Sequence, residues 1–171
     1  MVAASWKQRL SSYFATCLFW FCVVLAVQVA LSSFLVRRKP EIALKAIEGH
    51  LLRLQTATAY APETAFLSFD LQADLRPILS GTTRQVYVYV TAEAGNASSC
   101  AVLWDYVVGS ERDAVINLSN QRAKYPLRAF PGETLRGVSV TLRLHYMVMP
   151  YIGIYHKRAA EGSARLVILN V

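Results

Sequence analysis

The pattern of hydrophobic and polar positions divides the chain into two parts. Residues 13–36 form a run of 24 residues without Asp, Glu, Lys or Arg. As a helix, this run would rise about 36 Å at about 1.5 Å per residue, which is enough to cross a hydrocarbon core of about 30 Å. Basic residues flank the run on both sides, and Pro40 opposes continuation of a helix beyond it. We therefore expect a membrane-spanning helix over residues 13–36.

Two other interpretations of this run are weaker. A buried core helix of this length without a charge is unusual, because one face of such a helix normally meets water. A cleaved signal peptide is suggested by Ala30-Leu31-Ser32, a small-x-small triplet. The hydrophobic part of a signal peptide, however, has about 7–15 residues, and this run is longer. An uncleaved anchor is therefore favoured.

Beyond the run, the hydrophobic period changes from that of a helix to that of a strand. Residues 41–60 fit a helix or a strand equally well, and Pro62 ends them. From residue 66 onwards, apolar and polar residues alternate with a period of two, which is typical of half-buried strands. The clearest candidates are Phe69–Leu75, Gln85–Thr91, Ala101–Val108 and Val138–Val148, and weaker ones are Val115–Leu118, Tyr125–Phe130 and Leu166–Leu169.

These strands predict an all-β domain. Six or seven short strands, joined by turns and without a convincing helix between them, favour an antiparallel β-sandwich behind one N-terminal transmembrane helix. We expect Phe69, Trp104 and Tyr146 in its core, with Val102, Trp104 and Tyr106 on one face of their strand. The expected organisation is a short N-terminal segment at 1–12, the spanning helix at 13–36, a stem at 37–62 and the sandwich at 63–171.

Charge and cysteine content exclude several classes of protein. The net charge is +7, and beyond the span 16 basic and 11 acidic residues leave +5. These basic residues are scattered singly between apolar ones, whereas nucleic-acid binders usually carry a clustered stripe. Cys100 is the one cysteine outside the apolar run, so no disulfide can form within the domain. Its spacing from His50, His145 and His156 does not suit structural zinc.

No motif of a known catalytic class occurs. The chain lacks a Gly-x-Ser-x-Gly, a His-Glu-x-x-His and a Gly-rich phosphate loop. Asp70 and Asp74 share a strand face, but four residues of strand separate them by about 13 Å, which is wide even for an inverting carboxylate pair. His145 lies on the polar face of its strand, where a solvated or cross-strand role is the default. We predict no catalytic residue, no metal site and no cofactor.

Two other kinds of site can be predicted. Asn96-Ala-Ser98 and Asn117-Leu-Ser119 are acceptor triplets for N-glycosylation. On the strand from Val138 to Val148, the face opposite the apolar one carries Arg143, His145, Met147 and Met149. Methionines are soft, adaptable apolar groups that are frequent at binding surfaces. This face is therefore a candidate partner surface, although another element of the same domain could equally cover it.

Several of these segments resemble a known family in their order and spacing. They are Phe69-Asp-Leu-Gln-Ala-Asp-Leu75, Arg84-Gln-Val-Tyr-Val-Tyr-Val-Thr-Ala-Glu93, Leu103-Trp-Asp105, Lys124-Tyr125, Leu135-Arg-Gly137, Val140-Thr-Leu-x-Leu144 and Val148-Met-Pro150 with Gly153. Behind a single N-terminal span, they are similar to the signal peptidase complex subunit 3 family. This family is the non-catalytic subunit of the eukaryotic endoplasmic-reticulum signal peptidase. The stem and the tail after Gly153 match it poorly.

The resemblance implies a topology and a set of partners. It implies a single-pass type II protein of the endoplasmic-reticulum membrane, with residues 1–12 in the cytosol and the sandwich in the lumen. The positive-inside rule alone would place the domain in the cytosol, because more basic residues follow the span than precede it. The implied partners are the catalytic subunit, the other subunits, the lipid bilayer and, indirectly, substrates that carry signal peptides; no nucleic acid is among them.

The resemblance also bears on glycosylation and on competing functions. Some members of the family carry an acceptor triplet before the last long strand, where this chain has Gly137-Val-Ser139, so this site is excluded here. One alternative function is an unrelated membrane-anchored, lumenal β-sandwich that recognises a glycan or a polypeptide. Another is a membrane-tethered hydrolase that uses His145, which no motif favours.

Overall fold

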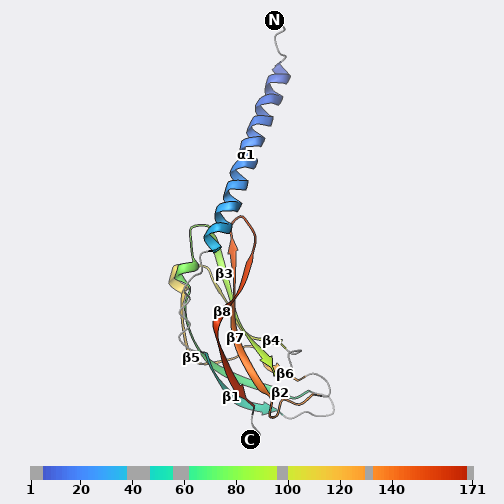
Figure 1. Ribbon diagram of the computed structural model, residues 1–171, viewed down its shortest axis with the longest axis vertical. Helices are drawn as coiled ribbons and strands as arrows, with labels where there is room; N and C mark the ends of the chain where they lie inside the picture. The colour runs from blue at the N-terminus through green and yellow to red at the C-terminus, as the bar shows by residue number, and fades with distance from the viewer. Residues whose placement is uncertain (1–5, 38–46, 56–61, 96–99, 130–132, 169–171) are drawn as a thin grey trace.

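The chain consists of one long helix followed by two antiparallel sheets that lie face to face (Figure 1). The computed structural model describes residues 6–37, 47–55, 62–95, 100–129 and 133–168. Helix α1 (Trp6–Arg37) projects from one end of the sheets, and the chain ends near their other end. The architecture is therefore the one that the sequence predicts, an antiparallel all-β domain behind one N-terminal helix.

Helix α1 has the length and composition of a membrane span. Its segment from Trp6 to Leu31 is apolar enough to cross a bilayer, and none of it is buried against the domain. Its large side chains, such as Phe14, Phe19 and Trp20, are exposed. A helix that is apolar on all sides would expose this surface to water unless protein covered it, whereas lipid tails provide an apolar environment for it.

The strands form two sheets, each with a simple antiparallel order. The first sheet has the order β1-β2-β5, with β6 also paired to β2, and the second has the order β4-β3-β7-β8. Two short 3₁₀ helices, η1 (Arg76–Ile78) and η2 (Glu111–Asp113), lie between strands. The strands are β1 (Ile47–Gln55), β2 (Thr64–Asp74), β3 (Thr83–Ala94), β4 (Cys100–Val108), β5 (Val115–Arg122), β6 (Leu127–Arg128), β7 (Ser139–Pro150) and β8 (His156–Val167).

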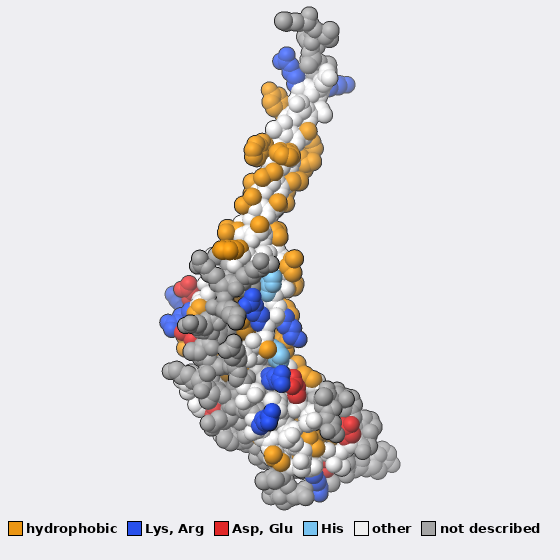
Figure 2. Space-filling view, in the orientation of Figure 1, with side chains coloured by type: hydrophobic (Ala, Val, Ile, Leu, Met, Phe, Trp, Pro, Cys, Tyr) orange, Lys and Arg blue, Asp and Glu red, His pale blue; other side chains and the backbone are white. Residues whose placement is uncertain are grey.

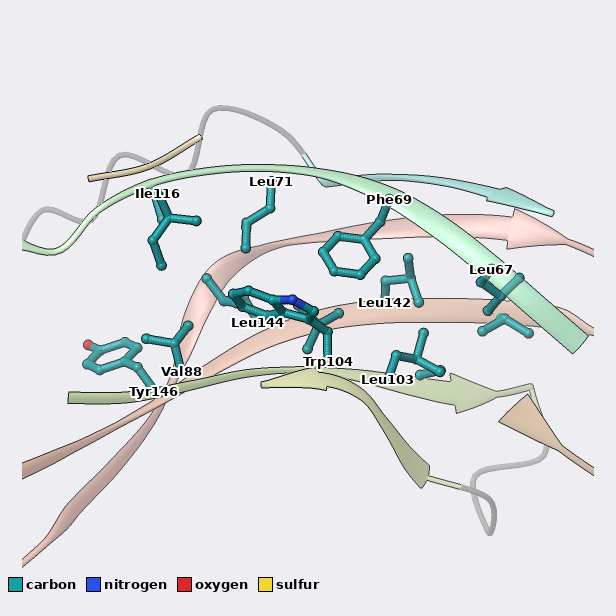
Figure 3. Close-up of a cluster of buried hydrophobic side chains, with 14 of the residues drawn as sticks. Leu67, Phe69, Leu71, Val88, Leu103, Trp104, Ile116, Leu142, Leu144 and Tyr146 are labelled. Carbon is teal, nitrogen blue, oxygen red and sulfur yellow. The ribbon is translucent and has the colours of Figure 1, made fainter. Parts of the chain in front are cut away.

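The core lies between the sheets because successive side chains of a strand point to opposite faces. From β2, Leu67, Phe69 and Leu71 point inward and are fully buried, and Leu142 and Leu144 meet them from β7 (Figure 3). Each fully buried side chain of this size contributes about 1.5–3 kcal/mol through removal from water. The domain contains one cysteine, so this apolar core stabilises it without a disulfide.

Trp104 lies at the centre of this core, but the predicted strand phase around it is wrong. The indole is 5% exposed and meets the ring of Phe69 edge to face, with centroids 6.0 Å apart. Val90 pairs with Trp104 and Thr91 pairs with Val102, so Leu103 is an extra residue on β4. This β-bulge turns both Leu103 and Trp104 inward, and Val102 faces outward. Only Tyr106, which stacks on Trp104, shares its face as expected.

Two strands differ from the sequence pattern in extent. Strand β1 lies inside the range 37–62, which we expected as a stem, and it pairs with β2 from Ile47↔Leu71 to Gln55↔Thr64. The first sheet therefore begins before residue 63, and the strand alternative for residues 41–60 is the one found in the described part. Strand β8 begins at His156, well before the apolar run at Leu166–Leu169, because the long strand β7 offers it a continuous partner.

A buried carboxylate ties the first sheet to the segment before β7. The Glu63 side chain is 5% exposed. Its Oε2 accepts a hydrogen bond of 2.6 Å from the backbone N–H of Leu135, and its Oε1 accepts one of 3.1 Å from Nε of Arg136. A charged group this deeply buried is tolerated only when it has such partners. Glu63 therefore fixes where the chain enters β7.

Candidate functional site

The most distinctive surface of the domain is the outer face of the second sheet. Strand β7 alternates strictly, so Tyr146 and Val148 point into the core, and His145, Met147 and Met149 point outward. On the neighbouring strand β3, Tyr87 pairs with Met147, and Tyr89 pairs with His145. We call the side chains of Tyr87, Tyr89, His145, Met147 and Met149 the outer aromatic patch.

Ring stacking orders this patch. The rings of Tyr87 and Tyr89 stack with centroids 5.3 Å apart, and the imidazole of His145 stacks on Tyr89 at 5.2 Å. Nζ of Lys157, from β8, lies 5.7 Å from the centroid of the Tyr89 ring. Aromatic pairs of this kind are each worth about 0.5–1.5 kcal/mol beyond burial, so the three rings form a preorganised surface.

The rim of the patch is polar and partly paired. Nε of Arg143 lies 3.2 Å from Oε2 of Glu93, an ion pair next to the stack. At Met149, the thioether Sδ accepts a hydrogen bond of 3.2 Å from Nε2 of Gln85 on β3. Met147 and Met149 are each partly exposed. An adaptable centre with a polar rim is the usual organisation of a protein-binding surface.

The electrostatics of the patch favour a neutral histidine. Burial among the neighbouring rings, followed by the positive charge of Lys157, lowers the pKa of His145 from its usual value. Burial also raises the pKa of Tyr87, so its phenol keeps its proton. At neutral pH, the centre of the patch therefore carries no charge, and the charges of Arg143, Glu93 and Lys157 surround it.

The described residues do not bring His145 together with a serine and a carboxylate in a hydrogen-bonded set. The His145 ring stacks on the ring of Tyr89, and Glu93, an acid whose charge acts on His145, pairs with Arg143. Within the described part of the chain, no three His, Cys, Asp or Glu residues are grouped as metal ligands would be. Asp70 and Asp74, the two carboxylates on one strand face, have separate partners, Asn120 and Arg76.

A hollow of ≈ 520 Å³ lies at the end of the sandwich away from α1. Leu127, Leu135 and Gly137 contribute to its wall, and Arg128 and Glu133 give it charges of opposite sign. The described wall contains Ser139 but no His, Cys or Lys that could activate a nucleophile. It offers space without an arrangement of reactive groups.

The predicted sites are distributed differently from the patch. Phe69, Trp104 and Tyr146 are buried in the core. Asn117 is exposed on the edge strand β5, and Asn96 lies outside the described residues. Sequence reasoning did not assign Tyr87, Tyr89 and Lys157 to the surface of His145. The alternation of Tyr87 and Tyr89 could be seen in the sequence, but the pairing of β3 and β8 with β7 could not.

Comparison with known proteins identifies the family. A family model described as a signal peptidase subunit matches residues 3–169, nearly the whole chain. The chain belongs to this signal peptidase subunit family. Its resemblance to the signal peptidase complex subunit 3 family, which the sequence motifs suggested, is thereby confirmed.

Individual members of the family are similar at about the level expected for distant relatives. The signal peptidase complex subunit 3 of Saccharomyces cerevisiae is 32% identical over 113 residues, which are 64% of this chain and 61% of the yeast protein. The subunit 3 of Dictyostelium discoideum is 31% identical over 126 residues, 72% of this chain and 71% of that protein. The match thus spans less than two thirds of the yeast protein and slightly more than two thirds of the amoebal protein.

Proposed function

We propose that this chain is a non-catalytic accessory subunit of the endoplasmic-reticulum signal peptidase complex. In this role it binds and supports the catalytic serine-protease subunit while signal peptides are removed from secretory and membrane proteins. The observation that carries the proposal is the family match over residues 3–169. The absence of a hydrogen-bonded catalytic set around His145 among the described residues is compatible with it.

The proposed topology is type II with a single span. Residues 1–12 lie in the cytosol, α1 crosses the membrane, and the sandwich lies in the lumen, where it can receive N-linked glycans. The basic residues after the span, Arg37, Arg38 and Lys39, oppose this orientation by the positive-inside rule. The family match outweighs that bias, because the rule is statistical and concerns flanking charge alone.

An engineered acceptor site tests the topology. Gly137 is exposed, its φ is +72°, and a Cβ added there meets no atom within 4 Å. Asparagine tolerates this left-handed conformation better than other residues, and Gly137→Asn completes an acceptor triplet with Ser139. In microsomes, the variant should show a mobility shift that a glycosidase removes. Gly137→Gln is the matched control. Digestion of residues 41–171 by protease added to sealed microsomes would place the domain in the cytosol instead.

The outer aromatic patch is the proposed contact surface for the catalytic subunit, with Arg143 at its rim. Its centre combines aromatic rings with partly exposed Met147 and Met149, and such centres dominate binding energy at protein interfaces. Because the two thioethers point away from the core, charged replacements should not unfold the domain. They would, however, place two carboxylates in a contact that excludes water.

Co-purification in mild detergent tests both the function and this surface. The wild-type chain should bring down a small membrane serine protease. The double variant Met147→Asp with Met149→Asp should remain folded and lose the protease. Val102→Asp with Val167→Asp places the same two charges on exposed positions of the same sheet outside the patch, and it should retain the protease. Reproducible absence of a protease from the wild-type sample contradicts the function, and retention by the methionine variant contradicts only the surface.

A further inference from the structure

The loop between β7 and β8, Tyr151–Tyr155, lies at the end of the sandwich from which α1 leaves. Strand β1 is the first after α1, and its first residue pairs with Leu71, near the end of β2. Strand β3 follows β2 and begins at the same end of the sandwich, where Thr83 pairs with Pro150, the last residue of β7. The N–H of Tyr151 then donates a hydrogen bond of 3.0 Å to the carbonyl of Thr82. The pairing register and the ribbon therefore agree on the position of the loop (Figure 1).

The loop is apolar and exposed over almost its whole length. Its sequence is Tyr151-Ile-Gly-Ile-Tyr155, without a charge between Pro150 and His156. Tyr151, Ile154 and Tyr155 are 67%, 65% and 64% exposed, and Ile152 is 41% exposed. A single exposed apolar residue needs no explanation, but four among five consecutive residues form a contiguous apolar patch, which is typical of an interaction site.

The fold holds this loop out rather than letting it collapse onto the domain. The last pair between β7 and β8 is Val148↔His156, so strand pairing reaches the residue directly after the loop and ends three residues before it. At the apex, Gly153 has a φ of +135°, a conformation that side chains rarely adopt. The glycine permits a sharp turn that leaves Ile152 and Ile154 on the outside.

The bilayer surface lies within reach of this tip. The apolar surface of α1 continues to Phe34, and only residues 38–46 separate the helix from β1. Nine residues span at most about 30 Å, even when fully extended. Figure 2 shows hydrophobic side chains gathered where the helix meets the domain. The loop thus belongs to the end of the sandwich that faces the headgroups.

We propose that Tyr151–Tyr155 inserts into the interfacial layer of the bilayer that α1 spans, as a second membrane contact of the domain. The composition of the loop fits this layer. Tyrosines concentrate at membrane interfaces because the ring prefers the acyl boundary and the hydroxyl prefers water and headgroups. Here two tyrosines flank two isoleucines in the sequence, and His156 and Lys157 follow directly, where they would meet the polar headgroups.

This contact would fix the tilt of the sandwich on the membrane. The helix alone is one attachment point of the domain, and an attachment at the β7–β8 tip would be a second one that restricts rotation about the first. The proposal rests on the proposed function only in requiring that α1 spans a bilayer. It requires neither the lumenal orientation nor the protease.

Site-specific fluorescence in vesicles tests the contact. The full chain, with Cys17→Ala, Cys22→Ala and Cys100→Ser, is reconstituted in phosphatidylcholine vesicles after labelling of a single new cysteine with an environment-sensitive nitrobenzoxadiazole dye. The test position is Ile154→Cys. Val167→Cys is the matched control, since it is 51% exposed on the same strand pair at the opposite end. Phe34→Cys, on the lipid-facing helix, is the positive control.

We expect blue-shifted emission from the label at residue 154, quenching by nitroxide-labelled phosphatidylcholine and protection from aqueous iodide. The label at 167 should emit as in water and be quenched by iodide. If the label at 154 behaves like the label at 167, the proposal is wrong. Blue-shifted emission at 154 without nitroxide quenching also overturns it and indicates that protein, such as a second copy, covers the loop. Neither result affects co-purification of a protease, so failure of the proposed function is detected separately.

Discussion

Replacement of Trp104 by alanine should cost the domain a large part of its stability. The indole is 5% exposed at the centre of the core, and it contacts two other aromatic rings. Phe69, from the other sheet, lies 6.0 Å away edge to face, and Tyr106 stacks at 5.9 Å. Truncation of a buried tryptophan costs about 3–5 kcal/mol, and the two ring pairs, at about 0.5–1.5 kcal/mol each, contribute to that sum.

The expected loss is large compared with the free energy of unfolding of an ordinary domain, about 5–15 kcal/mol. At about 4 °C per kcal/mol for a domain of this size, the melting temperature should fall by roughly 12–20 °C. Because Trp104 sits where the bulge at Leu103 turns two consecutive side chains inward, neighbouring residues cannot easily fill the cavity. Trp104→Phe keeps one ring in place and should lose much less.

The assay is thermal unfolding of the full chain in mild detergent, followed by circular dichroism in the β-sheet band. Trp20→Ala is the matched control, since this tryptophan is exposed on α1 and outside the sandwich. It should melt like the wild type. A melting temperature of Trp104→Ala within about two degrees of the wild type would refute the packing argument, because a cavity of this size should lower the free energy of unfolding by much more.

Two further perturbations test a buried carboxylate and a partly buried histidine. Glu63→Gln should lower the free energy of unfolding by about 1.5–3 kcal/mol, because its hydrogen bonds to Leu135 and Arg136 lose their charge, and an unchanged urea midpoint would contradict this. For His145, the folded-state pKa lies below the usual value near 6.5, so the unfolded chain binds the proton more readily. This contribution to stability is therefore complete above about pH 6.5 and is lost as the pH falls through the folded-state pKa. Between about pH 7.5 and about pH 5.5, the wild type should lose stability relative to His145→Gln, and parallel pH profiles of the two would refute the shift.

The sequence predicts the fold class because the decisive signals are local. An uncharged run such as 13–36 can satisfy its surface in lipid, and the alternation in β2 and β7 has one buried phase. The bulge at Leu103 escapes this reasoning, because an extra residue on one strand is defined only by its partner. Strand β1 was ambiguous and β8 was mostly unpredicted for the same reason, since long partners, β2 and β7, impose the extended conformation on them.

The candidate surface is predicted only in part. Alternation alone places Arg143, His145, Met147 and Met149 on the outer face of β7. The stacking of His145 on Tyr89 depends on the β3–β7 register, which pairs these two residues although they are more than fifty positions apart in the chain. No local pattern encodes such a register, so the aromatic centre of the patch becomes visible only in the folded chain.

The position of β3 between β4 and β7 has a consequence for synthesis of the protein. While the chain grows, β3 can pair with β4 as soon as that hairpin is made, but its other edge waits for β7, the second-last strand. Throughout this interval a long strand rich in valine and tyrosine presents unpaired backbone groups, the kind of edge that invites pairing with other chains. A nascent chain that stops before residue 139 is therefore an aggregation hazard, and a chaperone that binds extended segments would protect it until β7 arrives.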